Sequence, residues 1–266
     1  MLGVVTGLKS EAQLLRGLDV MCISTGGRAH IAGAKIDRLV SRGMRGLVSF
    51  GIAGALSPNL KCGDLVIADK VVGGTGESWP AHAPWIDAVL QSVAPSRNGG
   101  RQDDVPHHAA ARRSEGHAQA GPEWSAAHDD APEIAPQGRG DGKAGVRVGA
   151  ILGLDRMLSS PGEKAAAFAR SGALAVDMES HHVASAAAER GLPFIAIRAI
   201  SDEAHETLPA VLASFVDTEG RTKMSAVVAA LILVRVGLGE LLQAGRASKR
   251  AHQALLRCRG TIAGLR

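Results

Sequence analysis

The sequence predicts an α/β protein in which apolar strands alternate with helices along one chain. The clearest observation is that residues 173–204 have the pattern of a βαβ unit. An apolar strand at 173–176 leads into an Ala-rich helix that should end at Gly191, because glycine accepts the left-handed conformation and Pro193 cannot continue a helix. Residues 194–200 are apolar at nearly every position, which is typical of a strand buried on both faces of a parallel sheet.

Polar residues follow both strands of this unit. Asp177 and Glu179 come after the first strand, and Ser201 and Asp202 come after the second. A crossover of this length should return the chain parallel and right-handed. We therefore expect both pairs at the same carboxyl edge of neighbouring strands, where open α/β sheets bind ligands. Acids at such turns can also be simple helix caps, so their spacing alone leaves a structural role open.

The other elements are predicted in order along the chain. A strand at residues 2–6 breaks at Gly7, and a helix begins at Ser10 with Glu11 in its first turn. The helix dipole favours an acid there whatever its function. Further strands are expected at 20–24, 46–50, 64–72 and 146–153, and further helices at 29–42 and between Ser160 and Gly172.

Glycine-rich segments follow two of these strands. Gly26 and Gly27 precede Arg28 and a helix, an arrangement that can present backbone N–H groups to an anion. Residues 51–54, GIAG, have neither the Lys-Ser/Thr pair of a Walker loop nor the third glycine of a dinucleotide fingerprint. These segments therefore do not predict an ATPase or a dinucleotide-dependent enzyme.

Composition indicates an ordinary soluble protein with one large core. The chain has 266 residues, of which 45% are hydrophobic and 21% charged. Its three cysteines are odd in number and scattered, which argues against a disulfide framework and fits a reducing cytoplasm. No signal segment precedes the first strand and no run of 18 apolar residues occurs, so we expect a cytoplasmic protein.

Two segments differ in composition from the rest. The only large apolar residues within 94–145 are Val105, Trp124 and Ile134, so this insertion should be disordered; its histidines lack zinc-site spacing, and no metal is predicted. Residues 222–266 are expected to be a helical segment that begins apolar, and residues 221–266 carry nine Arg or Lys residues against one acid. That segment could pack on the core with a solvated end, or rest on an anionic membrane surface.

Long strings in the sequence resemble a known family. VDMES at 176–180, followed by PFIAIRAISD at 193–202, resembles the paired signatures of the purine nucleoside phosphorylase and methylthioadenosine/S-adenosylhomocysteine nucleosidase superfamily. The string at 51–72 resembles its glycine-rich segment and the strand after it. The resemblance implies a single-domain three-layer α/β/α nucleoside phosphorylase-like fold over residues 1–266, with a mixed, mostly parallel central sheet. It also implies N-glycosidic bond cleavage without a cofactor, with phosphate as a possible co-substrate.

The resemblance assigns a role to each polar residue noted above. Cleavage leaves positive charge on the ribose and negative charge on the base, so it needs an acid near the base and an activated nucleophile. Asp202 is implied to donate a proton to N7 of the purine, with Ser201 orienting it. Glu179 is implied to bind the ribose hydroxyls, with Met178 under the ring, and Glu11 to activate water.

Further positions match the family by their place in its motifs. Arg198 matches a family arginine, and because an unpaired buried charge is costly, we expect it to be ion-paired and structural. The implied substrate contacts come from the glycine-rich segment and from the region where the family keeps an aromatic that stacks on the base. These contact residues are Gly51, Ile52, Ala53, Met157 and Leu158.

Departures from the family pattern concern the nucleophile. Ile52 stands where nucleosidases have serine, and Ser49 stands where trimeric or hexameric phosphorylases have a phosphate-binding arginine. The remaining candidates for binding phosphate are Gly7, Lys9 and Arg28. Hydrolysis is therefore favoured over phosphorolysis, although the sequence leaves both open.

One subgroup of the family resembles the chain in more places. Residues 6–15, 45–56 and 208–221, with the basic tail, resemble hopanoid-associated phosphorylase. This implies adenine release from adenosylhopane, an adenine nucleoside with a lipid 5′ substituent, in hopanoid biosynthesis. Residues 205–220 could then line an apolar 5′ opening, and the basic C-terminus could make peripheral contact with the inner face of the membrane.

The sequence leaves another enzymatic function open and disfavours two other classes of function. A methylthioadenosine/S-adenosylhomocysteine nucleosidase is the alternative enzyme, and homodimers are usual among such relatives. A non-catalytic nucleoside-binding protein is disfavoured because Glu11, Glu179 and Asp202 are all present, and pure binding does not need a general acid. No nucleic-acid partner is expected, since the basic tail lacks the interleaved aromatics that stack on bases.

Overall fold

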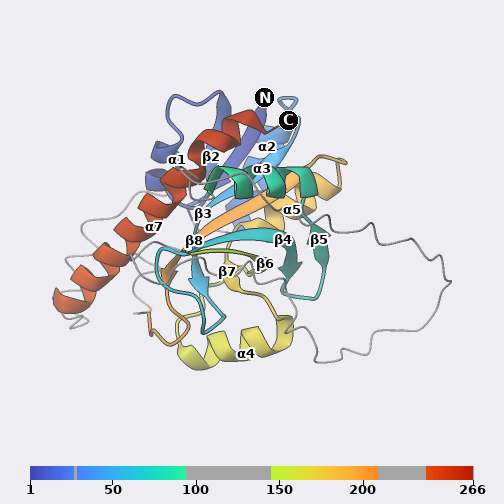
Figure 1. Cartoon of the computed structure of the whole chain (residues 1–266). Coiled ribbons are helices and arrows are strands. Elements are labelled where there is room, and N and C mark those ends of the chain that lie inside the picture. Colours follow the sequence, from blue (N-terminus) through green and yellow to red (C-terminus); the bar gives the residue numbers. More distant parts are fainter. Residues whose placement is uncertain (27–28, 94–144, 209–237, 266) are drawn as a thin grey trace, which may run out of the picture.

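The structure is a computed structural model of the chain, and it describes residues 1–26, 29–93, 145–208 and 238–265. Within these described residues, eight strands form one mixed sheet with helices on both faces (Figure 1). Five of its strand pairings are parallel and three are antiparallel, which confirms the predicted α/β class with a mostly parallel sheet. The strands are β1 (Leu2–Thr6), β2 (Val20–Ser24), β3 (Leu47–Ala55), β4 (Leu65–Gly73), β5 (Ser78–Pro80), β6 (Val146–Gly153), β7 (Ala175–Asp177) and β8 (Phe194–Asp202).

Part of the sheet closes on itself. β3 pairs with β8 along one edge and with β7 at its end, β8 pairs with β4, β4 with β6, and β6 with β7. These five strands form a ring, and β1, β2 and β5 extend from it. The end of β3 therefore has hydrogen-bonded partners on both sides, so the backbone under the site described below is held on both edges.

The predicted direction of one strand is wrong. β7 and β8 were expected to be parallel neighbours, but β7 is antiparallel to β3 while β8 is parallel to it. The three-residue β7 pairs with β3 only at Gly54 and Ala55, where the ring turns toward β6. The crossover rule holds for adjacent strands of an open sheet, and these two strands are separated by β3.

Six helices are described: α1 (Lys9–Leu14), α2 (Ala29–Val40), α3 (Ala83–Val93), α4 (Pro161–Ser171), α5 (Ser180–Ala188) and α7 (Leu238–Gly264). The predicted boundaries of α4 are confirmed. Ser160 Oγ accepts from Glu163 N at 3.3 Å, and the Glu163 carboxylate accepts from Ser160 N at 3.1 Å. Gly172 ends the helix in the left-handed conformation with φ +62°.

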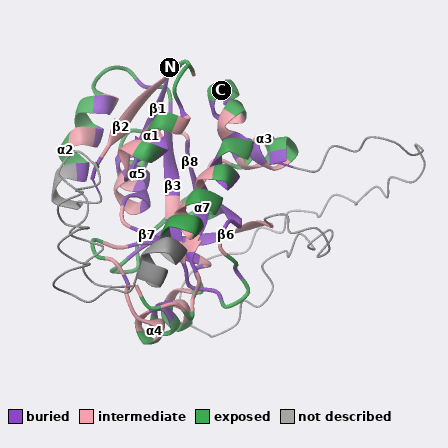
Figure 2. Cartoon of the chain, turned by 90° about the vertical axis from the view of Figure 1, so that its left-hand side faces the viewer, coloured by how far each residue is buried: buried purple, intermediate pink, exposed green. Residues whose placement is uncertain are grey.

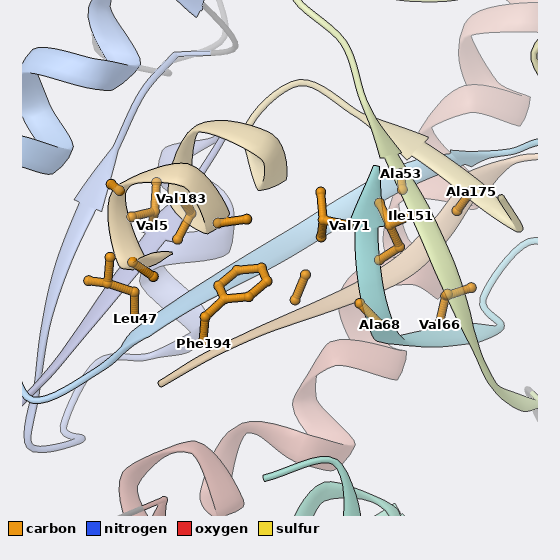
Figure 3. Packing of buried hydrophobic residues seen from close by; sticks show 14 of the residues in the cluster. Val5, Leu47, Ala53, Val66, Ala68, Val71, Ile151, Ala175, Val183 and Phe194 are labelled. Carbon is orange, nitrogen blue, oxygen red and sulfur yellow. The ribbon is translucent and has the colours of Figure 1, made fainter. Parts of the chain in front are cut away.

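The core lies on both faces of the sheet, so the layered arrangement is α/β/α. Residues of α2 and α5 pack on one face, where Figure 3 shows Val183 of α5 among side chains of several strands. Residues of α3 and α7 pack on the other face. In Figure 2 the inner strands are almost continuously buried, whereas exposed residues follow the outer side of α7. Ala, Val, Leu and Ile fill most of this interior, as the scarcity of aromatics requires.

The C-terminal helix packs on the sheet through one face. Ala251, Ala254, Leu255, Cys258 and Ile262 are buried in the cluster that includes strand residues of β3 and β8. Their spacing of three, four and seven residues is that of one helix face. The sequence left two interpretations of the C-terminal segment, packing on the core or resting on a membrane surface. The described helix packs on the core, and its basic side chains lie on the solvent side. None of the described helices is long and apolar enough to cross a membrane.

Some predictions concern residues outside the described ones. The insertion at 94–145 falls there except for Gly145, and so do Arg28 and the start of the C-terminal helix expected from Thr222. The 205–220 segment is described only as far as Leu208. The composition-based expectations for these segments stay predictions.

Candidate active site

Glu11 is the acid that α1 contributes. Its two carboxylate oxygens accept hydrogen bonds from the backbone N–H groups of Leu8 at 2.8 Å and Ile52 at 2.9 Å. The side chain is buried. Burial raises the pKa of Glu11, against the opposing effect of the Arg198 guanidinium. Glu11 is therefore fixed against the glycine-rich part of β3, and its environment favours proton uptake.

Glu179 lies at the start of α5, directly after β7. Thr25 Oγ1 donates a hydrogen bond to its Oε1 at 3.2 Å. A Cβ on Gly7 would stand only 3.0 Å from the same oxygen, so glycine there lets the backbone approach the carboxyl group. Burial raises the pKa of Glu179 to about 7, with Arg198 opposing the rise and the Asp177 carboxylate adding to it.

Arg198 supplies the positive charge between these acids, from the middle of β8. It is fully buried, with its Nε 2.5 Å from Oδ2 of Asp177 and its Nη2 3.6 Å from Oε2 of Glu179. Nη2 also donates to Ser49 Oγ at 2.6 Å. The prediction that Arg198 is ion-paired is confirmed. Ser49, which stands where related phosphorylases have an arginine, is thus a partner of the buried guanidinium.

Asp202 ends β8 and is held from two sides. Ser201 Oγ donates to its Oδ1 at 2.8 Å, and Lys164 Nζ is 2.6 Å from its Oδ2. Lys164 is completely buried. Lys164 is not among the predicted site residues. A signal for it existed, because Lys164 lies at three-, four- and seven-residue spacing from Ala167, Phe168 and Ser171 on one face of α4.

The segment from Gly51 to Gly54 joins the two groups of acids. A Cβ on Gly51 would be 2.5 Å from Arg198 Nη1, and a Cβ on Gly54 would be 2.9 Å from Asp202 Oδ2. Ala53 O accepts from Ser201 Oγ at 3.2 Å. The register between β3 and β8 shifts after Ala53, so Ser201 has no strand partner of its own. Such bulges often re-aim side chains beside active sites. The predicted contact residues Gly51, Ile52 and Ala53 therefore lie between the acids.

The other predicted contact residues, Met157, Leu158 and Met178, differ in how far they are buried. Met178 and Met157 are half-buried. Leu158 is buried in a cluster with Leu56 and Leu152, so it occupies a core position rather than an open platform for a base. Met178 and Met157 stay predicted contact residues, each with a partly exposed side chain.

Of the three phosphate-binding candidates, the structure describes Gly7 and Lys9, whereas Arg28 lies outside the described residues. Gly7 faces the Glu179 carboxyl group, which would repel an anion if ionised. Lys9 instead lines a cavity of about 530 Å³ between α1, β2 and α2, together with Arg38 and Arg42. None of the acids of the site lines this cavity. Gly7 and Lys9 therefore do not form a shared phosphate cradle.

One cluster within the described part of the chain could hold a metal ion. Nε2 of His181 and Nε2 of His182 lie 2.9 and 3.0 Å from Oδ1 of Asp155. Burial lowers the pKa of His182, and the neighbouring His181 acts in the same direction. Hydrogen bonds between the two imidazoles and one carboxylate account for this arrangement, and it includes none of the acids grouped around β3.

Comparison with known proteins assigns the family. A family model described as Phosphorylase superfamily matches residues 14–233, and the chain belongs to that superfamily. Two 5′-methylthioadenosine/S-adenosylhomocysteine nucleosidases, from Mycobacterium bovis and Mycobacterium tuberculosis, are each 30% identical over 169 residues. The match covers 60% of this chain and 60% of each relative, so the chain spans about 60% of the length of these curated relatives.

Solved structures share the fold. The S-adenosylhomocysteine nucleosidase of Streptococcus pyogenes, in complex with 5-methylthiotubericidin, has a TM-score of 0.61 at 17% identity and covers 100% of this chain and 97% of its own. The Helicobacter pylori nucleosidase with butyl-thio-DADMe-Immucillin-A has a TM-score of 0.61 at 14% identity, covering 99% and 98%. At these identities the likeness shows the nucleoside phosphorylase-like fold.

Proposed function

We propose that the protein is a nucleosidase that releases adenine from 5′-methylthioadenosine or S-adenosylhomocysteine by hydrolysis. The observation that carries this proposal is the placement of Glu11 and Asp202 at the Gly51–Gly54 segment of β3, with Glu179 3.6 Å from the Arg198 guanidinium that approaches Gly51. The names of the mycobacterial relatives support this substrate class. They favour it over adenosylhopane, the substrate that the subgroup resemblance implies.

Each acid has a role that its surroundings suit. Asp202 donates a proton to the departing purine, oriented by Ser201. Glu179 accepts hydrogen bonds from the ribose hydroxyls. Glu11 takes the proton of the attacking water, and a carboxyl group whose pKa is raised toward neutrality is better matched to that task. Departure of the base and attack of water are thus assisted by different residues.

Water is favoured over phosphate as the nucleophile for a structural reason. Phosphorolysis needs a cationic cradle for an anion, and Gly7 and Lys9 do not form one. Buried carboxyl groups close to the reacting carbon would also repel a phosphate dianion. A neutral water molecule needs no cationic cradle and is not repelled by carboxyl groups.

Adenosylhopane is the second candidate, on the resemblance of three stretches to hopanoid-associated phosphorylase. With it goes peripheral contact of the basic C-terminal segment with a membrane. A homodimer is proposed for either candidate. The two candidates differ at the 5′ side of the ribose, where one requires a thioether slot and the other an open apolar channel.

The deciding experiment is a product assay on the full chain. We expect adenine and free methylthioribose from 5′-methylthioadenosine in phosphate-free buffer, with no increase in rate when phosphate is added. Dependence on phosphate, with a sugar 1-phosphate as product, would make the enzyme a phosphorylase. Preference for a long 5′-alkyl adenosine over methylthioadenosine would favour the second candidate. Absence of adenine release from every nucleoside would overturn the proposal.

A further inference from the structure

Lys164 has an unusual position for a lysine. Its side chain is completely buried although it belongs to α4, a helix with solvent on its outer side. Lysine is almost never fully buried unless its charge is paired, because removing an ammonium group from water is costly. Because burial of Lys164 beside the proposed acid Asp202 is costly, we expect this lysine to have a function in the site.

The ammonium group uses all three of its donors. Nζ lies 2.6 Å from Oδ2 of Asp202 and donates to the carbonyl oxygens of Glu203 at 2.8 Å and Glu206 at 3.1 Å. Asp202 is the one carboxylate among these three acceptors. The contacts to Glu203 and Glu206 fix the backbone after β8, whereas the contact to Asp202 acts directly on the reacting group.

We propose that Lys164 is a positioning residue for protonation of the leaving base, acting through Asp202; this inference rests on the proposed function. Ser201 holds Oδ1 and Lys164 holds Oδ2, so the carboxyl group is fixed opposite Gly54. Geometry set in advance is what makes a general acid efficient, because no reorganisation is needed as charge develops on the base.

The ion pair also provides a source for the proton. As the bond from C1′ to the base breaks, its electron pair stays with the base. Lys164 Nζ passes one of its protons to Oδ2 of the Asp202 carboxylate, and Asp202 gives a proton to the base nitrogen. Water attacks C1′ and loses its proton to Glu11. Exchange with solvent then returns that proton equivalent to Lys164, so the net reaction consumes one water and no proton.

The test compares two leaving groups on the full-length enzyme. Lys164→Met removes the charge but keeps most of the side-chain volume. With methylthioadenosine we expect kcat to fall by about 10²-fold, as for loss of general acid assistance. With a methylthioriboside of 4-nitrophenol, whose anion departs without protonation, we expect little change. If both substrates slow equally, Lys164 has only a structural role, and if neither slows, it has none in the reaction.

Controls separate this role from folding. Lys61→Met removes an exposed lysine that pairs with Glu203 at 2.9 Å, and it should leave both rates within about twofold, as for a surface ion pair. If Lys164→Met does not fold, Lys164→Gln can still donate to the two carbonyl oxygens and should show the same dependence on the leaving group. A rate that falls equally on both substrates in that variant overturns the proposal.

A double variant provides an independent check. If Lys164 acts through Asp202, Lys164→Met combined with Asp202→Asn should be no slower on methylthioadenosine than Asp202→Asn alone. Additive losses would contradict the proposal while leaving the proposed function intact. A wild-type enzyme that cleaves the nitrophenyl riboside but no adenine nucleoside would instead overturn the proposed function.

Discussion

Nε of Arg198 lies 2.5 Å from Oδ2 of Asp177, and this buried ion pair sets the charge of the whole site. Glu179 and Glu11 share the same guanidinium at longer range, and burial raises the pKa of both. A single positive charge thus faces three carboxyl groups. Because burial disfavours the ionised form of a carboxyl group, the two glutamates take up protons more readily than they would in water.

Arg198→Met should destabilise the protein strongly. The substitution leaves Asp177 as a buried carboxyl group without its counter-charge, and breaking such a pair costs roughly 3–5 kcal/mol. The free energy of unfolding, measured in urea, would show this loss. Arg190→Met is the control, because Arg190 pairs with exposed Asp37 at 2.8 Å and should contribute about 0–1 kcal/mol. Equal losses in the two variants would contradict a central role for the buried pair.

Glu179→Gln should flatten the dependence of stability on pH. The pKa of Glu179 is raised from 4.5 to about 7 in the folded state, so between these values the folded protein holds a proton that the unfolded chain has lost. The free energy of unfolding must therefore fall as pH rises through this window, by at most roughly 3 kcal/mol for this group.

Urea unfolding at several pH values between 4.5 and 8 measures this effect. Part of the slope should remain in Glu179→Gln, since the pKa of Glu11 is raised as well. Glu189→Gln, at an exposed position at the opposite end of α5, should leave the wild-type slope unchanged. An unchanged slope in Glu179→Gln would show that this carboxyl group is already ionised across the window.

Asp202→Asn should lower turnover on methylthioadenosine by roughly 10²–10⁴-fold, the usual contribution of a general acid. The amide oxygen can still accept from Lys164, so the fold should persist, although Lys164 loses its counter-charge. Steady-state kinetics together with circular dichroism separate the two effects. Near wild-type kinetics in a folded variant would remove Asp202 from the mechanism.

Local rules predicted much of the fold, and non-local pairing explains what they missed. The capping box of Ser160 and Glu163 and the left-handed Gly172 and Gly191 depend on neighbours within a few residues, so the sequence displays them. The closed ring depends on which distant strands hydrogen-bond to one another. The hydrophobic periodicity of the sequence predicts individual strands but not their pairing.

The site, like the fold, has residues that the sequence predicts and one that depends on contacts between distant segments. Glu11, Glu179 and Asp202 could be predicted because they lie in recognisable strings of the family. Lys164 could not, because its partner Asp202 lies 38 residues further along the chain and only the packing of α4 brings them together. The sequence does show one lysine on the buried face of α4, but this pattern does not identify the residue that the lysine contacts.

Adjacent leucines of α7 test how the C-terminal helix is used. Leu255 is fully buried in the core cluster shared with β3 and β8, whereas 43% of Leu256 is exposed. Leu255→Ala should therefore cost about 2–5 kcal/mol of unfolding free energy through lost burial and a cavity. Leu256→Ala should change it by no more than about 0.5 kcal/mol.

A double variant on the exposed side of α7 addresses membrane contact. Truncation at Gln243 would remove the buried face of α7, so any loss of vesicle binding would be confounded by unfolding. Leu256→Ala with Lys249→Gln changes only exposed positions and keeps the core. We expect co-sedimentation with anionic vesicles at low salt to be the same for this variant and wild type, because the apolar face of the described helix is already covered by the sheet. A clear loss of binding in the folded variant would show that the outer side of α7 contacts lipid and would favour the lipid-linked substrate.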